Sequence, residues 1–461
     1  MFSRNTYSTR REQLKKDVGS GIIVLPGNDE VGMNYKDNIY HFRQDSTFLY
    51  FTGIDRPDVI LIIDIDNNTE TLFGDDLTIE QMVWTGPVEN LTSQADKSGI
   101  AAVKKYDVAE TVIKQAIASK QDIHFIPPYR GVIAAKLSDW LNVPYNTLKE
   151  RASLPLIKAI INQRSYKSAE EIVQIEEAIN TTSAMQLKAI ELGSPGITEY
   201  EIAGQLTGIA FGGGGNLSFP IILTANGQFL HNHASHAPLE SGRLVLCDCG
   251  AENPMRYAGD LTRTSPVDKK FTARQKDVYE IVLNAQTAAI EALKPGTLFW
   301  DVHFIACTKL AEGLKNLGII KGDVKEAVAA GVHTLFFQCG LGHMMGLDVH
   351  DMENLGEEYV GYTDTLKKSK EFGTRSLRLG RALEPGFTVT VEPGLYFVPD
   401  LIDAWHADKK HLDFINYDKA KEFKDFGGIR IEDDYLITPI GGRLLGKPLA
   451  KTIAEIEALK E

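Results

Sequence analysis

The feature that most constrains the fold is a weak internal repeat in the second half of the chain. A helical pattern opens at Ser168, with Glu171 completing a capping box, and runs to Gly193 before a second helix begins. About a hundred residues later, a helical pattern over 272–293 ends at Lys-Pro-Gly and is again followed by a helix. Glycine-rich, strand-like sequence succeeds each pair. Two copies of a helix–helix–strand unit predict an α+β domain with a pseudo-twofold axis; chance similarity between helical segments is the alternative.

The first half of the chain has a different pattern, because strand-like and helix-like segments alternate along it. Two apolar runs rich in β-branched residues, 21–27 and 58–66, are closed by turn residues and are typical of strands. Amphipathic segments that read as helices follow them. This alternation predicts an α/β domain over residues 1–165. The helix that opens at Ser168 then begins the second domain, residues 166–461.

Composition limits the compartment and the partners. A net charge of −13, from 49 basic and 62 acidic residues, argues against a nucleic-acid partner or an anionic membrane surface. No apolar run reaches the length of a membrane span, and the N-terminal segment lacks the apolar core of a signal peptide. The cysteines form no Cys-x-x-Cys pair and are too few for a disulfide framework, so we expect a reducing, cytoplasmic compartment. They are Cys247, Cys249, Cys307 and Cys339.

Two aspartates flank a turn in sequence that otherwise looks buried. Asp248 ends the apolar run 244–247, and Asp260 follows a turn marked by Pro254. A hairpin centred on Pro254 would place the two carboxylates opposite each other on adjacent strands. Like charges so placed must share a proton, bind a cation or both face water, and two solvated carboxylates are the structural alternative.

Three further stretches carry polar side chains in apolar patterns. The glycine-rich segment 340–351 contains His343 and His350. Period-2 alternation places Glu392 on one face of a strand with two threonines, and Glu432 on one face of another strand with Arg430 and Asp434. Any one of these alone is more often a satisfied core residue or an exposed face. Together the stretches supply the candidate ligand set Asp248, Asp260, His343, Glu392 and Glu432.

Four carboxylates in one pocket repel one another unless cations offset their charge. Two divalent ions offset it, and mostly oxygen ligands with one imidazole suit Mn²⁺, with Co²⁺, Fe²⁺ and Zn²⁺ as alternatives. Two such ions also lower the pKa of a water molecule between them and supply hydroxide near neutral pH. The sequence therefore predicts two divalent metal ions as cofactors.

The segments "LCDCGAE…YAGDLTRT", "GLGHMMGLDVHD", "TVEPGLY" and "GIRIEDD" resemble the signature of the pita-bread metallopeptidases. The resemblance is to their proline-directed branch, which contains aminopeptidase P and prolidase. Segment 40–63, "YHFRQDSTFLYFTGIDRPDVILII", resembles the N-terminal domain of aminopeptidase P. The resemblance covers nearly the whole chain and implies a C-terminal pita-bread domain preceded by an α/β N-terminal domain.

Carried over by position, the resemblance implies a role for each candidate ligand. One metal ion would be held by Asp248, Asp260 and Glu432. The other would be held by Asp260, His343, Glu392 and Glu432, so that Asp260 and Glu432 bridge the two ions. Glu392 would also act as base and then acid during hydrolysis of the bond before proline.

The resemblance also implies residues around the metal ions. His231 matches the family's outer histidine, and His350 matches the histidine that contacts the substrate carbonyl and the tetrahedral intermediate. Arg430 and Tyr396 match residues that support the site, with Tyr396 placed on the substrate side. Cys339 stands where the family usually has histidine, which puts one supporting contact in doubt but not the ligand set.

The implied activity is a metal-dependent hydrolysis of Xaa-Pro bonds at peptide N-termini, with proline-containing peptides as partners. Cleavage of Xaa-Pro dipeptides is the alternative, because 373–386 and the insert 397–428 resemble eukaryotic-type prolidase. Arg378 matches that enzyme's carboxylate-binding arginine, or else it is a solvated or salt-bridged charge. A binding protein without activity is a remoter alternative. We also expect a homo-oligomer, a dimer or a tetramer, with Trp84 and Asp45 near the site across subunits.

Overall fold

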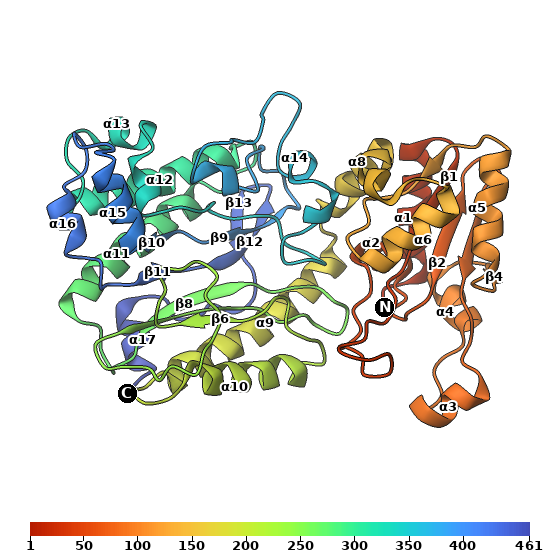
Figure 1. The fold of residues 1–461 in the computed structure, drawn as a ribbon, viewed down its shortest axis with the longest axis horizontal. Helices are drawn as coiled ribbons and strands as arrows, with labels where there is room; N and C mark the ends of the chain where they lie inside the picture. Colours follow the sequence, from red (N-terminus) through yellow and green to blue (C-terminus); the bar gives the residue numbers. More distant parts are fainter. The chain divides into compact units, whose positions relative to one another are not determined.

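The computed structural model describes residues 1–461 and forms two compact units (Figure 1). One unit comprises Met1–Arg164 together with the short segment Asn354–Gly356. The other comprises Ser165–Glu353 and Glu357–Glu461. None of the helices is both long enough and apolar enough to cross a membrane.

The N-terminal unit is built on a five-stranded mixed sheet in the order β4-β3-β2-β1-β5. The three central strands pair antiparallel, and each edge strand pairs parallel to its neighbour. The two apolar runs of the sequence are β1 and β2, whose side chains share a core with α5 and α6, so the predicted α/β domain is confirmed. The strands are β1 (Ile22–Pro26), β2 (Ile60–Asp64), β3 (Thr69–Phe73), β4 (Ala102–Lys104) and β5 (Ile123–His124). The helices are α1 (Arg4–Val18), α2 (Ser46–Thr52), α3 (Ile79–Thr85), α4 (Leu91–Ser98), α5 (Val108–Ala118), α6 (Gly131–Leu141), η1 (Tyr145–Thr147), α7 (Leu148–Arg151) and α8 (Leu154–Arg164).

The C-terminal unit contains the helix repeat that the sequence predicts. α9 (Ala169–Leu192) packs against α10 (Glu199–Gly212), and α11 (Ala273–Glu291) packs against α12 (Phe299–Asn316). The first helix of each pair opens with a capping box, and a glycine with positive φ lies in the turn of each pair. Figure 1 shows the strands of this unit between the two helix pairs. The α+β class with pseudo-twofold symmetry is therefore confirmed.

The strands of the C-terminal unit form three short antiparallel sheets, β6-β7-β8, β13-β12-β9 and β10-β11. A single bridge between Thr262 and Glu432 joins the first sheet to the chain between β11 and β12. The strands are β6 (Ile222–Thr224), β7 (Leu244–Cys249), β8 (Leu261–Pro266), β9 (Thr388–Val391), β10 (Gly394–Tyr396), β11 (Gly428–Arg430), β12 (Asp433–Thr438) and β13 (Gly441–Leu444). The remaining helices are α13 (Val324–Ala329), η2 (Val332–Leu335), η3 (Glu353–Leu355), α14 (Glu357–Val360), η4 (Thr374–Ser376), α15 (Pro399–Ala407), α16 (Tyr417–Lys421) and α17 (Ile453–Ala458).

Two buried glutamines show how closely the two halves correspond. Gln186 of α9 donates from Nε2 to carbonyl oxygens of β7 and β8, at 3.1 and 2.5 Å. Gln286, at the equivalent place on α11, donates to a carbonyl of β9 and to that of Ile431, both at 3.3 Å. Because a buried amide needs hydrogen bonds, each glutamine ties its helix to two backbone segments of its own half, which are β7 and β8 for Gln186 and β9 and the link between β11 and β12 for Gln286.

Candidate metal centre

The hairpin that carries Asp248 and Asp260 differs in register from the sequence prediction. Asp248 of β7 pairs with Thr262 of β8, so the two aspartates are not opposite each other. The prediction was wrong because the ladder is centred one residue beyond Pro254, which leaves Asp260 just before β8. Since side chains alternate along a strand, Asp248, Asp260 and Thr262 nevertheless share one face of the sheet.

Three buried ligand-type side chains converge on one point of the C-terminal unit: Asp260, His343 and Glu432. Their ligand atoms all lie within 4.8 Å of one another. His343 Nε2 is 3.5 Å from Asp260 Oδ2 and 3.7 Å from Glu392 Oε1, which brings in a fourth candidate ligand. Asp248 lines the same pocket. The structure thus brings together the five residues of the predicted ligand set.

Local hydrogen bonds orient these side chains. Thr262 Oγ1 donates to Glu432 Oε2 at 2.7 Å, and Thr390 Oγ1 accepts from the backbone N–H of His343 at 3.1 Å. His343 Nδ1 lies 3.0 Å from the Met344 carbonyl oxygen, which can only accept, so Nδ1 carries the proton. The lone pair of His343 is therefore on Nε2, the nitrogen that faces the carboxylates, as metal binding requires.

The carboxylates are strained electrostatically when no cation is present. Burial and then neighbouring negative charges raise the pKa of Asp260 and of Glu432 well above the usual range. Burial is also the main cause that raises the pKa of Glu392 to about 7. Three buried carboxylate oxygens at this centre have no hydrogen-bond partner, namely Oδ1 of Asp248, of Asp260 and of Asp434. Unpaired buried acceptors beside an imidazole nitrogen fit the binding of divalent cations.

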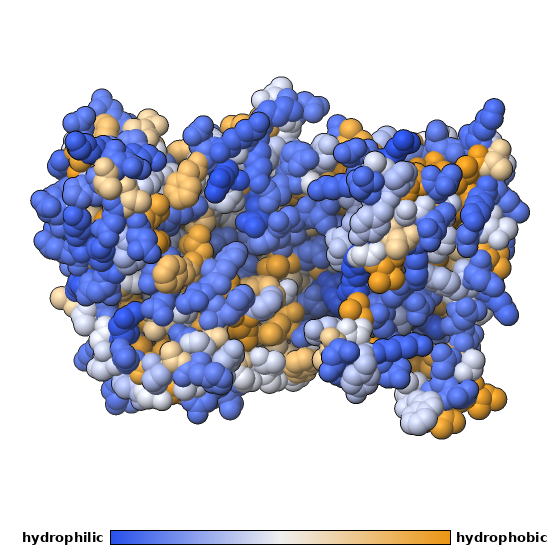
Figure 2. Space-filling model, viewed as in Figure 1, coloured by the Kyte–Doolittle hydropathy of each residue, from blue (hydrophilic) through white to orange (hydrophobic).

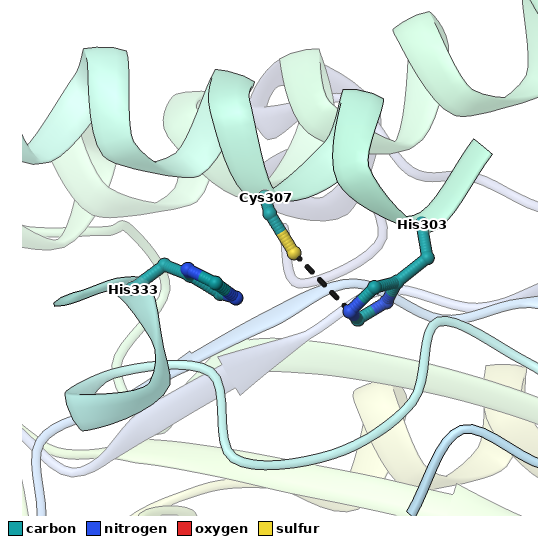
Figure 3. A group of neighbouring side chains, drawn as sticks. All are labelled: His303, Cys307 and His333. Atoms are coloured by element: carbon teal, nitrogen blue, oxygen red, sulfur yellow. Dashed lines mark hydrogen bonds between the residues drawn. The ribbon is translucent and has the colours of Figure 1, made fainter. Parts of the chain in front are cut away.

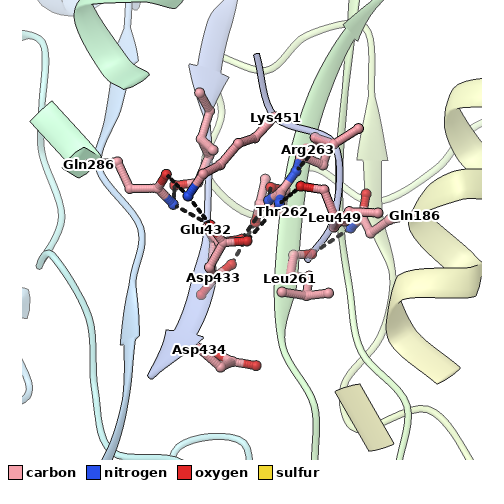
Figure 4. A network of polar contacts seen from close by, with 12 residues as sticks. Gln186, Leu261, Thr262, Arg263, Gln286, Glu432, Asp433, Asp434, Leu449 and Lys451 are labelled. Carbon is pink, nitrogen blue, oxygen red and sulfur yellow. Dashed lines mark hydrogen bonds and ion pairs between the residues drawn. The ribbon is translucent and has the colours of Figure 1, made fainter. Parts of the chain in front are cut away.

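A buried polar network lies behind the ligands and joins the two halves (Figure 4). Asp433 accepts hydrogen bonds from Arg263 Nη2 at 2.6 Å, from Lys451 Nζ at 2.8 Å and from Gln286 Nε2 at 3.1 Å. Burial acts to raise the pKa of Asp433, but Arg263 and Lys451 outweigh it and hold the pKa below its usual value. Removing one member of such a buried pair leaves an uncompensated charge. The network therefore fixes the strand segment that presents Glu432.

Asp434 is a residue of the centre that the sequence analysis did not assign a role. Its Oδ2 accepts the backbone N–H of Asp260 at 3.2 Å, and burial raises its pKa well above the usual value. The signal was present in the sequence, because the period-2 pattern puts Asp434 on the same face as Arg430 and Glu432.

Arg430 and Tyr396 form a buried pair that holds Asp248. Arg430 donates from Nη2 to Asp248 Oδ2 at 2.5 Å and from Nη1 to the Tyr396 hydroxyl at 2.9 Å. Tyr396 is fully buried and is absent from the pocket wall, so the structure places it behind Arg430 rather than on the substrate side. Cys339 lines the pocket, with its Sγ 4.0 Å from the Tyr396 hydroxyl.

The candidate ligands open onto a pocket of about 300 Å³. Its polar lining comprises the carboxylates together with His231, His233, His350 and Arg378. Its apolar lining includes Phe219, Pro220, Ile222, Leu230 and Val349. A mostly apolar cavity with a few convergent polar groups is the usual form of a small-ligand site.

His350 and Arg378 meet at one carboxylate that sequence reasoning missed. His350 Nδ1 is 2.6 Å from Glu353 Oε2, and Arg378 Nε donates to the same oxygen at 3.2 Å. The hydrogen bond from His350 and the charge of Arg378 lower the pKa of Glu353 to about 2, although burial acts to raise it. The His350 ring also packs edge-on against His343, with centroids 4.3 Å apart. Glu353 therefore orients two pocket residues at once, although its position in the sequence, in a polar loop, gives no signal of this.

His231 lies at the exposed mouth of the pocket. Burial of part of the ring and then the charge of Arg430 lower the pKa of His231, which favours neutral imidazole. His233 also lines the pocket, with its Nδ1 3.2 Å from the Ile221 carbonyl, whereas His236 packs on Tyr200. Of the three histidines in this loop, His236 is thus the one that the pocket excludes.

A carboxylate-rich centre in an open pocket, set between two related halves, defines a metal-dependent hydrolase. Residues 173–439 match the model of metallopeptidase family M24, and residues 7–124 match the aminopeptidase P N-terminal domain. The chain therefore belongs to metallopeptidase family M24.

Individual relatives resemble nearly the whole chain. The Xaa-Pro dipeptidase of Homo sapiens is 31% identical over 460 residues, which cover 97% of this chain and 90% of that protein. The Xaa-Pro aminopeptidase of Escherichia coli (strain K12) is 31% identical over 471 residues, covering 99% and 98%. Aminopeptidase P from Escherichia coli, solved with the inhibitor Pro-Leu, superimposes with a TM-score of 0.80 at 29% identity, covering 99% of this chain and 98% of that one.

Proposed function

We propose that this chain is a two-metal peptidase that hydrolyses the Xaa-Pro bond at peptide N-termini. The observation that carries the proposal is the cluster of Asp260, His343 and Glu432 in a pocket with an apolar wall. An apolar wall suits the ring of a proline residue, while the carboxylates can hold the ions that hydrolysis needs. The names of the bacterial and human relatives support the same substrate class.

The cofactors are proposed to be two divalent ions, with Mn²⁺ first and Co²⁺, Fe²⁺ or Zn²⁺ as alternatives. The proposed ligands are Asp248, Asp260, His343, Glu392 and Glu432, with Asp260 and Glu432 shared between the ions. When bound, the ions supply a strong nucleophile from water at neutral pH and offset the carboxylate charge.

The other side chains move or hold charge around that nucleophile. Glu392 is proposed to take the proton of the attacking water and to return it to the proline nitrogen, and its raised pKa suits both steps. His350 and His231 line the pocket where a carbonyl oxygen becomes negative, and they are proposed to stabilise it. Arg430 keeps Asp248 in place, and we assign Tyr396 to positioning Arg430.

Arg378 is proposed to decide between dipeptides and longer peptides, because a side chain that binds the substrate's C-terminal carboxylate would favour dipeptides. Its Nε contacts Glu353 and Glu357, at 3.2 and 3.4 Å, which matches the salt-bridge interpretation. Neither of its Nη groups donates a hydrogen bond to the protein, so they remain available for a substrate carboxylate. Relatives of both activities are equally similar and do not decide between them. We propose aminopeptidase activity and keep dipeptidase activity as the alternative.

A homo-oligomer, a dimer or a tetramer, is proposed from the surface of α3. Ile79, Val83 and Trp84 of this helix are 82%, 78% and 83% exposed, and no residue of α3 is buried. Figure 2 shows orange, hydrophobic atoms on the surface at the place where Figure 1 labels α3. Exposed apolar patches of this kind mark contact surfaces. Asp45, which we also expected near the site of a neighbouring subunit, caps α2, where its carboxylate accepts from the Phe48 N–H at 2.8 Å.

A cytoplasmic compartment is also proposed, because the four cysteines form no disulfide.

The proposed function is tested by reconstituting metal-free protein with Mn²⁺, Co²⁺ or Zn²⁺ and measuring cleavage of matched peptides. Xaa-Pro-Yaa, Xaa-Pro and Xaa-Ala-Yaa peptides separate the three possibilities. Cleavage of Xaa-Pro-Yaa alone, or faster cleavage of Xaa-Pro-Yaa than of Xaa-Pro, supports aminopeptidase activity. Faster cleavage of Xaa-Pro favours the dipeptidase, and cleavage of Xaa-Ala-Yaa at the same rate would overturn specificity for proline.

A further inference from the structure

A second cluster of ligand-type side chains lies in the C-terminal unit, outside the carboxylate centre. It consists of His303, Cys307 and His333, which we call the imidazole–thiol cluster (Figure 3). Their ligand atoms all lie within 4.8 Å of one another, and Cys307 Sγ is 3.4 Å from His303 Nε2. None of these residues lines the pocket described above, so the peptidase mechanism does not use them.

The helix geometry explains how the cluster forms. His303 and Cys307 are four residues apart on α12 and therefore share one face of that helix. His333 reaches the same point from η2, and Figure 3 shows all three side chains turned toward one another. Their exposed fractions are 1%, 0% and 3%, so the cluster is closed to solvent.

Hydrogen bonding within the protein does not satisfy this cluster. Cys307 is the only partner of His303, through Nε2, and His303 Nδ1 has none. Neither nitrogen of His333 has a partner; the Val328 carbonyl is near enough to affect its pKa but does not meet hydrogen-bond geometry. A neutral imidazole has one N–H and one lone pair, and the lone pair of His333 is buried without a donor, which is costly unless a cation takes it up.

The surroundings keep both imidazoles in the form that binds metal. Aromatic rings surround them, with Phe304 and Phe337 at 5.2 and 5.6 Å from the His303 ring centroid. Burial lowers the pKa of His303 to about 3 and the pKa of His333 to about 4. Neutral imidazole is the ligand state, whereas the Cys307 thiol must lose its proton on metal binding.

We propose that His303, Cys307 and His333 bind a Zn²⁺ ion at a third metal site, separate from the carboxylate centre. Two imidazoles and a thiolate select thiophilic ions, unlike the oxygen ligands of the other centre. Donors at about 2.0 and 2.3 Å from a tetrahedral ion lie about 3.5 Å apart, which the sulfur–nitrogen separation already matches. The thiol proton goes to solvent as the ion binds, and the resulting thiolate offsets one of the two positive charges of the zinc ion.

The ion would stabilise the structure rather than act in catalysis, because the three side chains are closed to solvent. The ion would fasten η2 to α12, and the chain continues from η2 through Cys339 to the ligand His343. An ion that binds only the folded state stabilises it by mass action. Zinc should therefore raise Tm and hold in place the segment that delivers His343.

The test uses the whole chain with the carboxylate centre disabled by Asp260→Asn. After loading with Zn²⁺ and removal of excess, we expect one tightly held ion per chain, and X-ray absorption should show one sulfur and nitrogen ligands. Loading with Co²⁺ instead should give a thiolate-to-cobalt charge-transfer band, which oxygen and imidazole ligands cannot give.

Four variants assign the ligands, each compared with the same loaded parent. Cys307→Ser and His333→Phe should each abolish the charge-transfer band and lower zinc affinity at least tenfold. Cys339→Ser, which removes the thiol beside the carboxylate centre, and Cys247→Ser, a buried thiol in β7, should both keep the band. No sulfur signal in the Asp260→Asn protein, or a signal that disappears with Cys339, overturns the proposal. The first of these outcomes is read without any variant of the cluster, so misfolding of a cluster variant cannot obscure it.

Discussion

The carboxylate centre and the imidazole–thiol cluster are two buried polar groups in the same domain, yet burial acts on them in opposite ways. Burial raises the pKa of the carboxylates, and each neighbouring negative charge raises it further. Burial lowers the pKa of His303 and His333, which then stay neutral and repel little. The first group needs cations to be ionised together, whereas the second tolerates their absence at the cost of a buried imidazole lone pair without a donor.

The two groups also differ in access. The carboxylates lie at strand ends and open onto a pocket, while the cluster is enclosed between α12 and η2. Strand ends and the loops that follow them can present side chains to a peptide substrate, whereas the packed face of a helix cannot. The comparison indicates chemistry at the first group and stabilisation at the second.

The largest expected effect comes from removing a shared ligand of the carboxylate centre. Asp260→Asn keeps the size of the side chain but removes a charge that both ions are proposed to share. We expect both catalytic ions to be lost and peptidase activity to fall to background, while the imidazole–thiol cluster keeps its zinc. Metal analysis alongside the peptide assay measures this. Two catalytic ions still bound per chain would contradict the assigned ligand set and erase the contrast between the two groups.

A smaller effect is expected for His350, which is proposed to contact the substrate but no ion. His350→Ala removes a donor from the developing oxyanion, which typically costs about 10²–10³ in kcat. The content of catalytic metal should stay unchanged. His236→Ala, in an exposed loop position against Tyr200, is the matched control and should have wild-type kinetics. A parallel loss of metal and activity in His350→Ala would show that His350 belongs to the metal centre itself.

Arg378 should affect one substrate and spare the other. If its Nη groups bind a substrate carboxylate, Arg378→Ala weakens Xaa-Pro cleavage by about 1.5–3 kcal/mol, because a hydrogen bond to a charged group is lost. Xaa-Pro-Yaa presents an amide at that place and should be cleaved as before. Arg375→Ala is the control, since Arg375 is exposed and packs on Phe372. Equal losses on both substrates, or no loss, would leave Arg378 as a salt-bridge partner of Glu353.

Much of the fold and of the ligand set could be predicted because both leave periodic signals. The repeated helix pairs gave the α+β architecture, and the alternation in the strand before Glu392 and around Glu432 pointed both toward one site. The predicted register of the hairpin was wrong by two residues, because Asp248 pairs with Thr262 and the turn is centred one residue beyond Pro254; the turn centre depends on backbone conformation rather than on where the proline falls.

Other residues left no signal in the sequence. Glu353 acts through a loop whose path only the tertiary structure sets, and its pairing with His350 and Arg378 is not periodic. The imidazole–thiol cluster joins positions on α12 to η2, and the short spacing on α12 alone is common in helices. Contacts between elements that are distant in sequence are set by packing, which pattern analysis does not contain.

The smallest expected effect separates the two buried groups by the sign of their pH dependence. In metal-free protein His333 has a folded pKa of about 4 against an ordinary value of 6.5. The stability that its neutral form contributes is complete above pH 6.5 and is lost as the pH falls toward 4, because the unfolded chain binds the proton first. The carboxylates act in the opposite direction: Glu392, with a folded pKa of about 7, favours the folded state less as pH rises toward 7.

His333→Phe should therefore reduce the loss of Tm between pH 6.5 and 4 by a few degrees relative to the wild type, with the carboxylate contribution unchanged. The measurement is Tm against pH after chelation of metal, with His236→Phe as the exposed control. Identical slopes in wild type and His333→Phe would show that the His333 imidazole is protonated as easily in the folded chain as in the unfolded one.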